Sequence, residues 1–407
     1  MTDEKKSYLK FTEQKGLMPQ EETLEVEHGK KKWLIGIPRE TDGNERRIPL
    51  SPSSVYLLVK NGHKVVIQEN AGKEAHFTNA EYAESGAEIV PDAATVFKSD
   101  IIAKISAPSE EEIEMLERNK MIFSTVFLQD RNREYFQKLL SKKINAIAYE
   151  YIKDKTGAFP LVRSMSEIIG NAAIMIAAEY LSHPEFGKGV MLGGFPGIPP
   201  SVVVILGAGT VAEYAARTAL GMGAEVKIFD DSIYKMRDLQ NRLPARVYTS
   251  TLQPPLLLKA FREADVVIGA KHSATGLSPC IIPLEMVKEM KSGAVIVDVS
   301  IDQGGCFETS RSTSHTHPAY KEEGITHYCV PNIASRVPHT ASYSISNFLA
   351  PLINRLSEAG SLEQLISQDK AFGKGVYIYN GILTNEGIGK KFGLSYRDLD
   401  LLMAAFQ

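Results

Sequence analysis

The most specific chemical pattern in this 407-residue chain is a glycine-containing turn in residues 202–212, Val-Val-Val-Ile-Leu-Gly-Ala-Gly-Thr-Val-Ala. Gly207 permits a sharp turn after the apolar run, and Gly209 lets the backbone approach a pyrophosphate. Ala212 keeps the following helix close to the strand, and the N–H groups at the start of that helix face the phosphate charge. The pattern predicts a dinucleotide site whose turn consists of Gly207, Ala208, Gly209, Thr210 and Val211.

A pair of acids follows the next predicted strand. Residues 225–229 read Glu-Val-Lys-Ile-Phe, and Asp230 and Asp231 come directly after them. A carboxylate at the end of this strand accepts hydrogen bonds from ribose hydroxyls and repels a 2′-phosphate, so the sequence favours NAD over NADP. Either aspartate could supply this carboxylate.

Two adjacent arginines, Arg46 and Arg47, could bind the carboxylate of a small substrate. A guanidinium forms two parallel hydrogen bonds and so fixes a carboxylate in one plane, which the point charge of a lysine does not do. On an extended segment only one of two neighbouring side chains can face inward. The simpler interpretation of either arginine is a solvated surface charge.

A further carboxylate, Asp302, lies just beyond the apolar run 294–299. Ligands of α/β proteins bind at the carboxyl ends of the strands, which is where this residue is expected. The simpler alternative is an aspartate that caps a loop through its own backbone. We predict a functional role for Asp302.

The elements that must position these residues form two successive blocks. Apolar runs alternate with helical segments from residue 33 to residue 151, which predicts a parallel sheet with crossovers. A second block of this kind surrounds the glycine turn and continues through 266–269 and 294–299. A long apolar-rich helix over 161–180 is expected to connect the blocks. We expect the segment after Val337, with helices over 344–358 and 361–368, to pack back on the first block.

Composition excludes several classes of protein. The net charge of -3 shows no electrostatic preference for nucleic acid or anionic membrane. No apolar run approaches the ~20 residues needed to cross a bilayer, so we expect no membrane partner. Residues 1–30 are rich in Lys and Glu and lack the apolar core of a secretory signal. Cys280, Cys306 and Cys329 are scattered without metal-ligand spacing, which predicts no metal site and suits a reducing cytoplasm.

Several ordered motifs together resemble the alanine dehydrogenase family, which is related to the nucleotide-binding subunit of proton-translocating transhydrogenase. The resemblance extends from about Lys32 to Leu394. The motifs are residues 36–41 and 44–47, Met165-Ser166-Glu167, residues 193–197, the turn at Gly207, residues 297–308, and residues 328–332.

This resemblance implies an α/β fold of two Rossmann-like, doubly wound parallel-sheet domains, separated by a cleft and joined by long helices. The expected parts are an N-terminal extension (1–30), a substrate domain (31–161 plus 338–407) and an NAD-binding domain (162–337). It also implies NAD-dependent oxidative deamination of L-alanine to pyruvate and ammonium by a homo-hexamer.

The resemblance also implies roles for single residues. Arg47 corresponds to the arginine that grips the substrate carboxylate. Asp302 corresponds to the aspartate between the nicotinamide ribose and the substrate. Ser166, Asp230 and the loop of Asn332 would then contact the cofactor.

Two family positions differ in this chain. Alanine dehydrogenases have a Lys-x-Lys-Glu-Pro run whose second lysine contacts the substrate carbonyl, and here that position is Ser106. The next strand in the family leads to a catalytic histidine, and here that position is Phe127. Neither side chain titrates near neutrality, and positioned acid–base groups contribute about 10²–10⁴-fold in rate. Ser106 and Phe127 would therefore line the substrate site without the family's proton chemistry.

Other residues could replace the missing groups. Lys104 lies two residues before Ser106, so strand alternation points it to the same sheet face. Lys73 and His76 occupy a loop that the first block could direct toward the cleft, and Lys271 with His272 follows a strand of the second block. The simpler interpretation of both pairs is a solvated loop.

Three functions remain open at this point. The first is an NAD-dependent alanine dehydrogenase with a small-molecule amino-acid or 2-oxo-acid substrate. The second is a catalytically weakened NAD(H)-binding homologue, a sensor or a transhydrogenase-like binding module. The third keeps the enzyme but changes the substrate to a bulkier or more apolar amino or imino acid.

Overall fold

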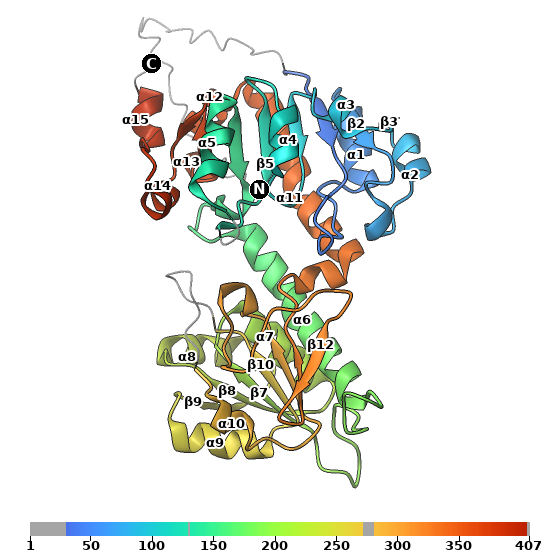
Figure 1. Ribbon diagram of the computed structural model, residues 1–407, viewed down its shortest axis with the longest axis vertical. Coiled ribbons are helices and arrows are strands. Elements are labelled where there is room, and N and C mark those ends of the chain that lie inside the picture. Colours follow the sequence, from blue (N-terminus) through green and yellow to red (C-terminus); the bar gives the residue numbers. More distant parts are fainter. Residues whose placement is uncertain (1–29, 129–130, 272–280, 405–407) are drawn as a thin grey trace, which may run out of the picture.

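The computed structural model describes residues 30–128, 131–271 and 281–404, and it contains two sheets that long helices connect. The first sheet carries the blue, teal and red parts of the chain in Figure 1, and the second carries the green, yellow and orange parts. Each sheet is covered by helices on both faces. Hydrophobic residues are therefore buried on both sides of every central strand, which is typical of mainly parallel sheets.

The first sheet has eight strands in the order β15-β14-β6-β5-β4-β1-β2-β3. The strands from β3 to β6 pair in parallel, while β14 and β15 are antiparallel additions at one edge. Their bounds are β1 (Leu34–Ile37), β2 (Lys64–Gln68), β3 (Glu88–Val90), β4 (Ile101–Ala103), β5 (Met121–Ser124), β6 (Asn145–Ala148), β14 (Val376–Tyr379) and β15 (Ile382–Leu383).

Period-two alternation divides the side chains of this sheet between two cores. Ile101 and Ala103 of β4 pack on the face covered by α1 (Pro52–Lys60) and α11 (Pro338–Ala359). Ile102 packs on the other face with α4 (Glu110–Met115) and α5 (Arg133–Ser141). Side-chain caps start most of these helices. For example, Ser109 accepts a hydrogen bond from the backbone N–H of Glu112. The helices are α1 (Pro52–Lys60), α2 (Asn79–Glu84), α3 (Ala93–Val96), α4 (Glu110–Met115) and α5 (Arg133–Ser141).

The second sheet has seven strands in the order β12-β13-β11-β10-β7-β8-β9. All neighbours pair in parallel except the edge strand β12, which is antiparallel to β13. The strands are β7 (Val202–Leu206), β8 (Glu225–Phe229), β9 (Tyr248–Ser250), β10 (Val266–Gly269), β11 (Val295–Asp298), β12 (Ala319–Glu322) and β13 (Ile325–Tyr328). The helices are α7 (Thr210–Gly221), α8 (Ile233–Arg242), α9 (Pro254–Glu263) and α10 (Leu284–Val287).

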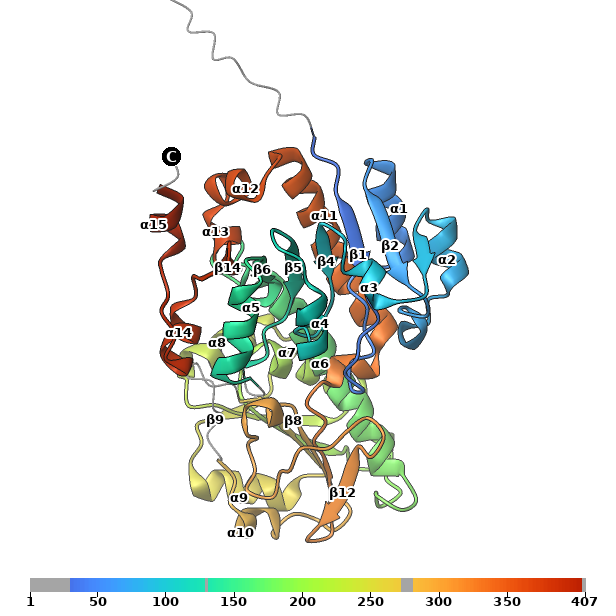
Figure 2. The same ribbon diagram turned by 45° about the horizontal axis from the view of Figure 1, so that its top comes forward.

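Two long helices, α6 (Pro160–Ser182) and α11 (Pro338–Ala359), run between the two sheets. By length and composition α6 could cross a membrane, but it lies against α7, α11 and β11 as the core helix of a globular protein does. Beyond α11 the chain returns to the first sheet, and Figure 2 shows the red C-terminal segment there. That segment consists of α12 (Leu362–Gln368), α13 (Lys370–Gly373), β14, β15, α14 (Glu386–Phe392) and α15 (Leu399–Ala404).

The predicted α/β class with two doubly wound, Rossmann-like sheets is confirmed. Both sheets contain the strand order 3-2-1-4-5-6 when their parallel strands are numbered along the chain, which is the order of dinucleotide-binding folds. The sheets differ from a purely parallel arrangement only at their edges. β15 and β12 join their sheets through short hairpins, and a short connection between neighbouring strands requires antiparallel pairing.

Candidate functional site

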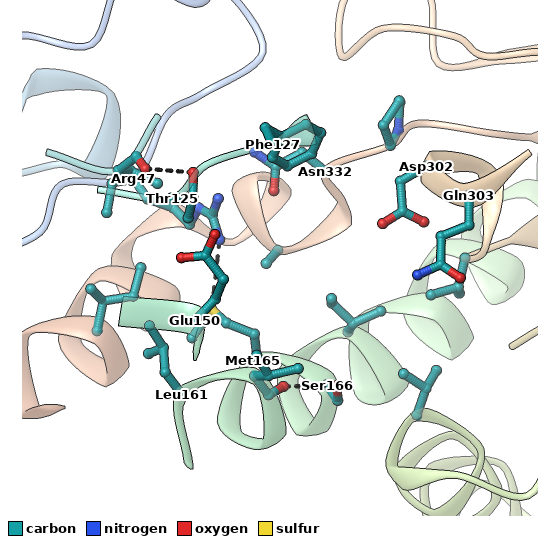
Figure 3. A pocket seen from close by; sticks show the side chains of 18 of the residues that line it. Arg47, Thr125, Phe127, Glu150, Leu161, Met165, Ser166, Asp302, Gln303 and Asn332 are labelled. Carbon is teal, nitrogen blue, oxygen red and sulfur yellow. Dashed lines mark hydrogen bonds between the residues drawn. The ribbon is translucent and has the colours of Figure 1, made fainter. Parts of the chain in front are cut away.

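A cavity of about 320 Å³ lies where the carboxyl ends of the strands of the two sheets face each other. Loops after β4, β5 and β6 line it from the first sheet, and loops after β10, β11 and β13 line it from the second. In Figure 3, Arg47, Thr125 and Glu150 lie on one side, Asp302 and Gln303 on the other, and α6 passes beneath. The lining is mostly apolar, with contributions from Ile105, Phe127, Leu161, Val162, Met165, Ile169, Val211, Ala270, Val299 and Ile345.

The glycine turn follows β7 and leads directly into α7. Gly207 has φ +111°, and an added Cβ would lie 2.5 Å from the carbonyl oxygen of Ala270, so only glycine fits there. A Cβ on Gly209 would instead meet nothing within 4 Å. Gly209 is the N-cap of α7 and has no side chain to cap it, which leaves the first N–H groups of the helix for a ligand. This cradle fits a pyrophosphate.

The two aspartates after β8 have different roles in the structure. Asp230 is buried, and its Oδ2 accepts a hydrogen bond of 2.9 Å from the backbone N–H of Ala208 in the glycine turn. Its Oδ1 accepts another of 2.8 Å from the N–H of Ser232. Asp231 is exposed and pairs with Lys271 at 2.5 Å. Asp230 therefore fixes the turn at the place where a ribose would lie.

Arg47 reaches the cavity, and a neighbouring carboxylate holds its guanidinium. Its Nε donates to Oε1 of Glu45 at 2.8 Å, and its Nη2 donates to Oε2 of the same residue at 2.6 Å. Its Nη1 lies 3.6 Å from the sulfur of Met165 on α6. One edge of the guanidinium is thus occupied, and the Nη1 end remains for a ligand in the cavity.

Glu45 also connects the two domains at this point. Burial alone would raise the pKa of Glu45, but the charge and hydrogen bonds of Arg47 outweigh it and lower that pKa. Its Oε2 accepts a hydrogen bond of 2.9 Å from Nδ2 of Asn332, which follows β13 of the second sheet. The ionised carboxylate therefore orients both Arg47 and Asn332, two residues that the sequence predicted for the site.

Asp302 lies on the opposite side of the cavity, in the 3₁₀ turn η4 (Ile301–Gln303) after β11. Buried Asp298 holds this loop by accepting hydrogen bonds from the N–H groups of Ser300 at 3.1 Å and Cys306 at 2.8 Å. Burial, and next the charge of Asp298, raise the pKa of Asp302 to about 6. A carboxyl with this pKa can both accept and donate a proton near neutrality.

Ser166 on α6 lines the same cavity between Arg47 and Asp302. Its hydroxyl donates a hydrogen bond of 2.8 Å to the carbonyl oxygen of Val162, one turn earlier in the helix. The oxygen of Ser166 keeps its lone pairs for a cofactor group. The structure thus brings Arg47, Ser166, Asp302 and Asn332 together around one cavity.

Of the two residues that differ from the family pattern, only Phe127 lines this cavity. Its side chain is 47% exposed, and its backbone has φ +47°. This left-handed region is uncommon for residues other than glycine, and histidine is among those enriched in it. Ser106 is held away from the cavity, and its backbone N–H donates to Oε2 of Glu40 at 3.2 Å.

Lys104 does not replace the family's lysine, although strand alternation suggested it could. Its side chain is fully buried, and its ammonium donates to both carboxylate oxygens of Glu112 at 2.8 and 2.7 Å. Glu40 lies 3.5 Å away on the other side. Burial opposes the charge, but these two carboxylates outweigh it and raise the pKa of Lys104. Lys104 is therefore enclosed by Glu40 and Glu112 and does not line the cavity.

The loop candidates do not line the cavity either. Lys73 and His76 are exposed in and after the 3₁₀ turn η1 (Lys73–Ala75). Lys73 borders a second cavity, which Arg47 separates from the first. Lys271 contacts the two aspartates after β8, and His272 lies outside the described residues. Within the described part of the chain, no group of three His, Cys, Asp or Glu side chains could hold a metal ion.

One cavity residue, Glu150, was missed by the sequence analysis. β6 ends at Ala148, and a 3₁₀ turn, η3 (Tyr149–Tyr151), follows it. Glu150 therefore lies at the carboxyl end of a central strand, where ligands bind in α/β folds. Burial raises its pKa to about 7. A lone acid directly after an apolar strand was the available signal.

Comparison with known proteins gives the family. The N-terminal domain of the alanine dehydrogenase/PNT family matches residues 36–169, and its C-terminal domain matches residues 173–386. The chain belongs to the alanine dehydrogenase/PNT family. This membership confirms the predicted resemblance, and it supports an oxidoreductase enzyme.

Relatives within this family cover nearly the whole chain. An alanine dehydrogenase of Staphylococcus saprophyticus is 37% identical over 368 residues, which are 90% of this chain and 99% of the relative. Alanine dehydrogenase 2 of Staphylococcus aureus is 35% identical over 90% of this chain and 98% of its own length. A solved L-alanine dehydrogenase has a TM-score of 0.82 at 35% identity, and covers 88% of this chain and 98% of its own. A transhydrogenase structure from Sinorhizobium meliloti, with a TM-score of 0.74 at 22% identity over 87% of this chain and 99% of its own, shares the fold.

Proposed function

We propose that this protein catalyses the NAD-dependent oxidative deamination of L-alanine, or of a related small L-amino acid, to a 2-oxo acid and ammonium. The observation that carries the proposal is the single cavity in which Arg47 and Asp302 face each other beside the glycine turn. A carboxylate-binding cation and a titratable acid on opposite sides are what an α-amino acid requires. Relatives named alanine dehydrogenase support this substrate class.

The residues around the glycine turn fit NAD. Gly207 to Val211 and the start of α7 would hold the pyrophosphate, and Asp230 would hold a ribose. Ser166 and Asn332 would contact the nicotinamide end, because both line the cavity. When bound, NAD supplies the acceptor for the hydride that leaves the α-carbon of the substrate.

The protein's own side chains position the substrate and handle its protons. The Nη1 end of Arg47 would bind the substrate carboxylate, while Glu45 keeps the guanidinium in a fixed orientation. Asp302, with a pKa of about 6, would be ionised at alkaline pH and would accept a hydrogen bond from the substrate amino group. The apolar lining from α6 excludes water and so strengthens these electrostatic contacts.

A second candidate is a catalytically weakened NAD(H)-binding homologue. It is favoured by one observation: among the described residues that line the cavity, Arg47 is the only basic side chain. If Ser106→Lys combined with Phe127→His raises alanine oxidation by about 10²-fold, the two family groups alone were missing. An unchanged rate indicates a site that differs more deeply.

The remaining proposals concern assembly and location. We infer a homo-oligomer, a hexamer by family resemblance, that works in the cytoplasm on a small molecule without nucleic acid or a membrane partner. An apolar loop before β7 supports self-association, since Met191 and Ile198 there are 67% and 63% exposed. Large apolar side chains at the surface commonly mark protein contacts.

The deciding experiment measures NADH formation with a panel of L-amino acids at alkaline pH, with the D-enantiomers as controls. Calorimetry of NADH binding to the same protein separates binding from turnover. Turnover of L-alanine or another small L-amino acid supports the proposal. Tight NADH binding without turnover of any amino acid contradicts it and leaves the second candidate.

A further inference from the structure

Glu150 is a carboxyl group in the substrate cavity whose position the proposed binding roles do not explain. It lies in η3 at the carboxyl end of β6, and its side chain points into the cavity between Arg47 and Met165 (Figure 3). Unlike Glu45, it forms no ion pair among the described residues. A carboxyl that only stabilised the fold would normally have such a partner.

The two oxygens of Glu150 have different surroundings. Oε1 accepts a hydrogen bond of 2.8 Å from the backbone N–H of Val126. Oε2 is shielded from solvent and has no hydrogen-bond partner among the described residues. In the part of the chain that the structure describes, five other buried polar side-chain atoms share this property, but none belongs to a residue that lines the cavity. Oε2 is therefore a buried acceptor left available at the site, where leaving it unpaired costs free energy.

The tether to Val126 places Glu150 beside the position that differs from the family. Val126 immediately precedes Phe127, the residue at the place of the family's catalytic histidine. Thr125 precedes both, and its hydroxyl is already donated to the carbonyl oxygen of Ile105 at 2.8 Å. Glu150 is thus a titratable side chain of the cavity wall that is hydrogen-bonded to the residue next to Phe127.

The charged and titratable groups around Glu150 come from several elements. Arg47, from the segment after β1, and Asp302, from the loop after β11, line the same cavity. Tyr149 and Tyr151 flank it in η3, and Tyr377 of β14 packs behind it. Burial raises the pKa of Glu150 to about 7, and the hydrogen bond from Val126 opposes this shift only in part. The group can therefore exchange a proton at neutral pH.

We propose that Glu150 is the acid–base residue that takes over proton transfer in this chain, where Ser106 and Phe127 replace the family's lysine and histidine. The inference rests on the proposed function, because it assigns a step of that same reaction. The Glu150 carboxyl would exchange protons with the water that attacks the iminium carbon of the substrate.

In the proposed hydrolysis of the iminium, each proton has a donor and an acceptor. As a water oxygen bonds to the iminium carbon, one water proton passes to the Glu150 carboxylate and a carbinolamine forms. The protonated carboxyl then gives this proton to the amino nitrogen. When the carbon–nitrogen bond breaks and ammonia leaves, Glu150 accepts the hydroxyl proton and the carbon–oxygen double bond of the 2-oxo acid forms. Transfer of that proton to ammonia yields ammonium and restores the carboxylate.

The test compares Glu150→Gln with the surface control Glu134→Gln on α5. The amide keeps the shape and the hydrogen bond from Val126 but cannot accept a proton. We expect kcat to fall by about 10²-fold or more in Glu150→Gln and to remain at the wild-type value in the control. We also expect the wild-type kcat to decline below about pH 7 with the protonation of Glu150, and this decline to move to about pH 6, where Asp302 becomes protonated, in the variant.

Two further measurements separate catalysis from structure. Glu150→Asp retains a titratable carboxyl, so its pH profile keeps an acid limb although its kcat is lower. Carboxyl signals of ¹³C-labelled glutamate, followed by NMR against pH, should lose one resonance that titrates near pH 7 in Glu150→Gln. Calorimetric NADH affinity should change by less than about twofold, since Glu150 does not lie at the glycine turn.

The outcomes distinguish this inference from the proposed function. If the wild type oxidises an amino acid and Glu150→Gln keeps both its kcat and its acid limb, the assignment of Glu150 is wrong and the proposed function stands. If the wild type binds NADH but oxidises no amino acid, the proposed function fails and the assignment fails with it. A labelled carboxyl that titrates near its ordinary value would also overturn the assignment.

Discussion

Arg46 and Arg47 are neighbours in the sequence, but they differ in what they contact. Arg47 lines the cavity between the sheets, whereas Arg46 lies on the side of the second cavity. The fork of Arg47 binds Glu45 through two nitrogens, so its orientation is fixed before any ligand arrives. Because Arg47 alone of the two lines the cavity between the sheets, we favour it as the arginine that could bind the substrate carboxylate.

Arg47→Lys should lower kcat/KM by roughly 10- to 100-fold, because a hydrogen bond to a charged group contributes about 1.5–3 kcal/mol. The lysine keeps the charge but loses the two-pronged contact with Glu45 and the fixed orientation. Initial-rate kinetics with the best amino acid of the panel measures the effect. Arg46→Lys is the matched control and should change kcat/KM by less than about threefold. Equal losses in both variants would contradict the assignment.

The raised pKa of Asp302 predicts that the free energy of unfolding depends on pH. The fold raises its pKa from 3.8 to about 6, so the folded state binds more protons than the unfolded state between these values. Stability is therefore lost as pH rises from about 4 to about 6. The ionised carboxylate costs about 1–3 kcal/mol above this range, after allowance for its partial exposure.

Asp302→Asn should remove this cost, and its free energy of unfolding should exceed that of the wild type at pH 8 but not at pH 4. Urea unfolding at several pH values measures the difference. Asp400→Asn, an exposed change on α15, should follow the wild type at every pH. A constant difference between Asp302→Asn and wild type across the range would show that burial of this carboxyl is not the cause.

Among the single residues, the sequence could predict the position of a side chain when that position follows from the strand just before it. Asp302 follows an apolar strand, and its place at the carboxyl end of the sheet brings it to the cavity, whereas Asn332 was implied by the family resemblance. Lys104 and Glu150 could not be placed in this way. The partners of Lys104 come from α4 and the segment after β1, and the burial of Glu150 depends on where β6 ends.

Among the elements, the turn between β7 and α7 makes the sharpest prediction. Gly209→Ala adds a Cβ that meets nothing within 4 Å in the folded chain, so the protein should fold normally. The methyl group would occupy space that a pyrophosphate needs, and NADH affinity should fall by about 10-fold or more, which is about 1.4 kcal/mol. Calorimetry and thermal unfolding measure the two effects.

Gly221→Ala, at the other end of α7, is the matched control. Its Cβ also meets nothing within 4 Å, but it lies far from the turn along the helix. It should leave NADH affinity unchanged and stabilise the helix by about 0.5–1 kcal/mol, because alanine favours helix more than glycine does. Loss of affinity in Gly221→Ala as well would mean that the cradle is not the cause.

The buried cluster between β4 and α4 gives a prediction about stability. Lys104→Met leaves Glu112 and Glu40 buried without their cation, and breaking a buried ion pair in this way costs about 3–5 kcal/mol. Urea unfolding measures this loss. Lys142→Met, which breaks an exposed pair with Glu114, should cost less than about 1 kcal/mol. If Lys104→Met abolished turnover without destabilising the protein, Lys104 would be a substrate contact after all.

Most elements were predictable from apolar periodicity, and their ends were less so. The helix expected over 161–180 is α6 over 160–182. The helix expected from 344 begins at Pro338, because proline is compatible with the first turn of a helix. The antiparallel hairpins at the sheet edges were missed, since their strands are short and carry little alternation.

At the scale of the whole molecule, two copies of one strand order meet at their carboxyl ends, and this arrangement creates the site. The alternation of strands and helices in each block predicted a parallel sheet with crossovers, and the family resemblance implied the doubly wound order. How far apart the sheets stand, and so the volume of the cavity, depends on side chains from both domains and on α6 and α11. No pattern within one block contains that information.

Self-association is the prediction that belongs to this scale. Light scattering after size exclusion should give a mass that is a multiple of 44.8 kDa. Ile198→Asp places a charge on the exposed apolar loop before β7 and should shift the mass toward that of a single chain. Lys155→Asp, at a distant loop of the first domain, is the control and should leave the mass unchanged. A single-chain mass for the wild type would contradict the prediction.

The return of β14 to the first sheet determines the order in which the protein can be completed during synthesis. The strands of the second sheet lie between residues 202 and 328, so they leave the ribosome as one uninterrupted stretch. The first sheet begins at residue 34, but it is complete only when β14 (Val376–Tyr379) has been made and pairs with the edge of β6. Domains usually fold as units while the chain emerges. The domain of the second sheet can therefore finish folding before the domain of the first sheet, although synthesis of the first sheet begins earlier. A nascent chain would thus acquire its dinucleotide cradle well before it can enclose an amino acid.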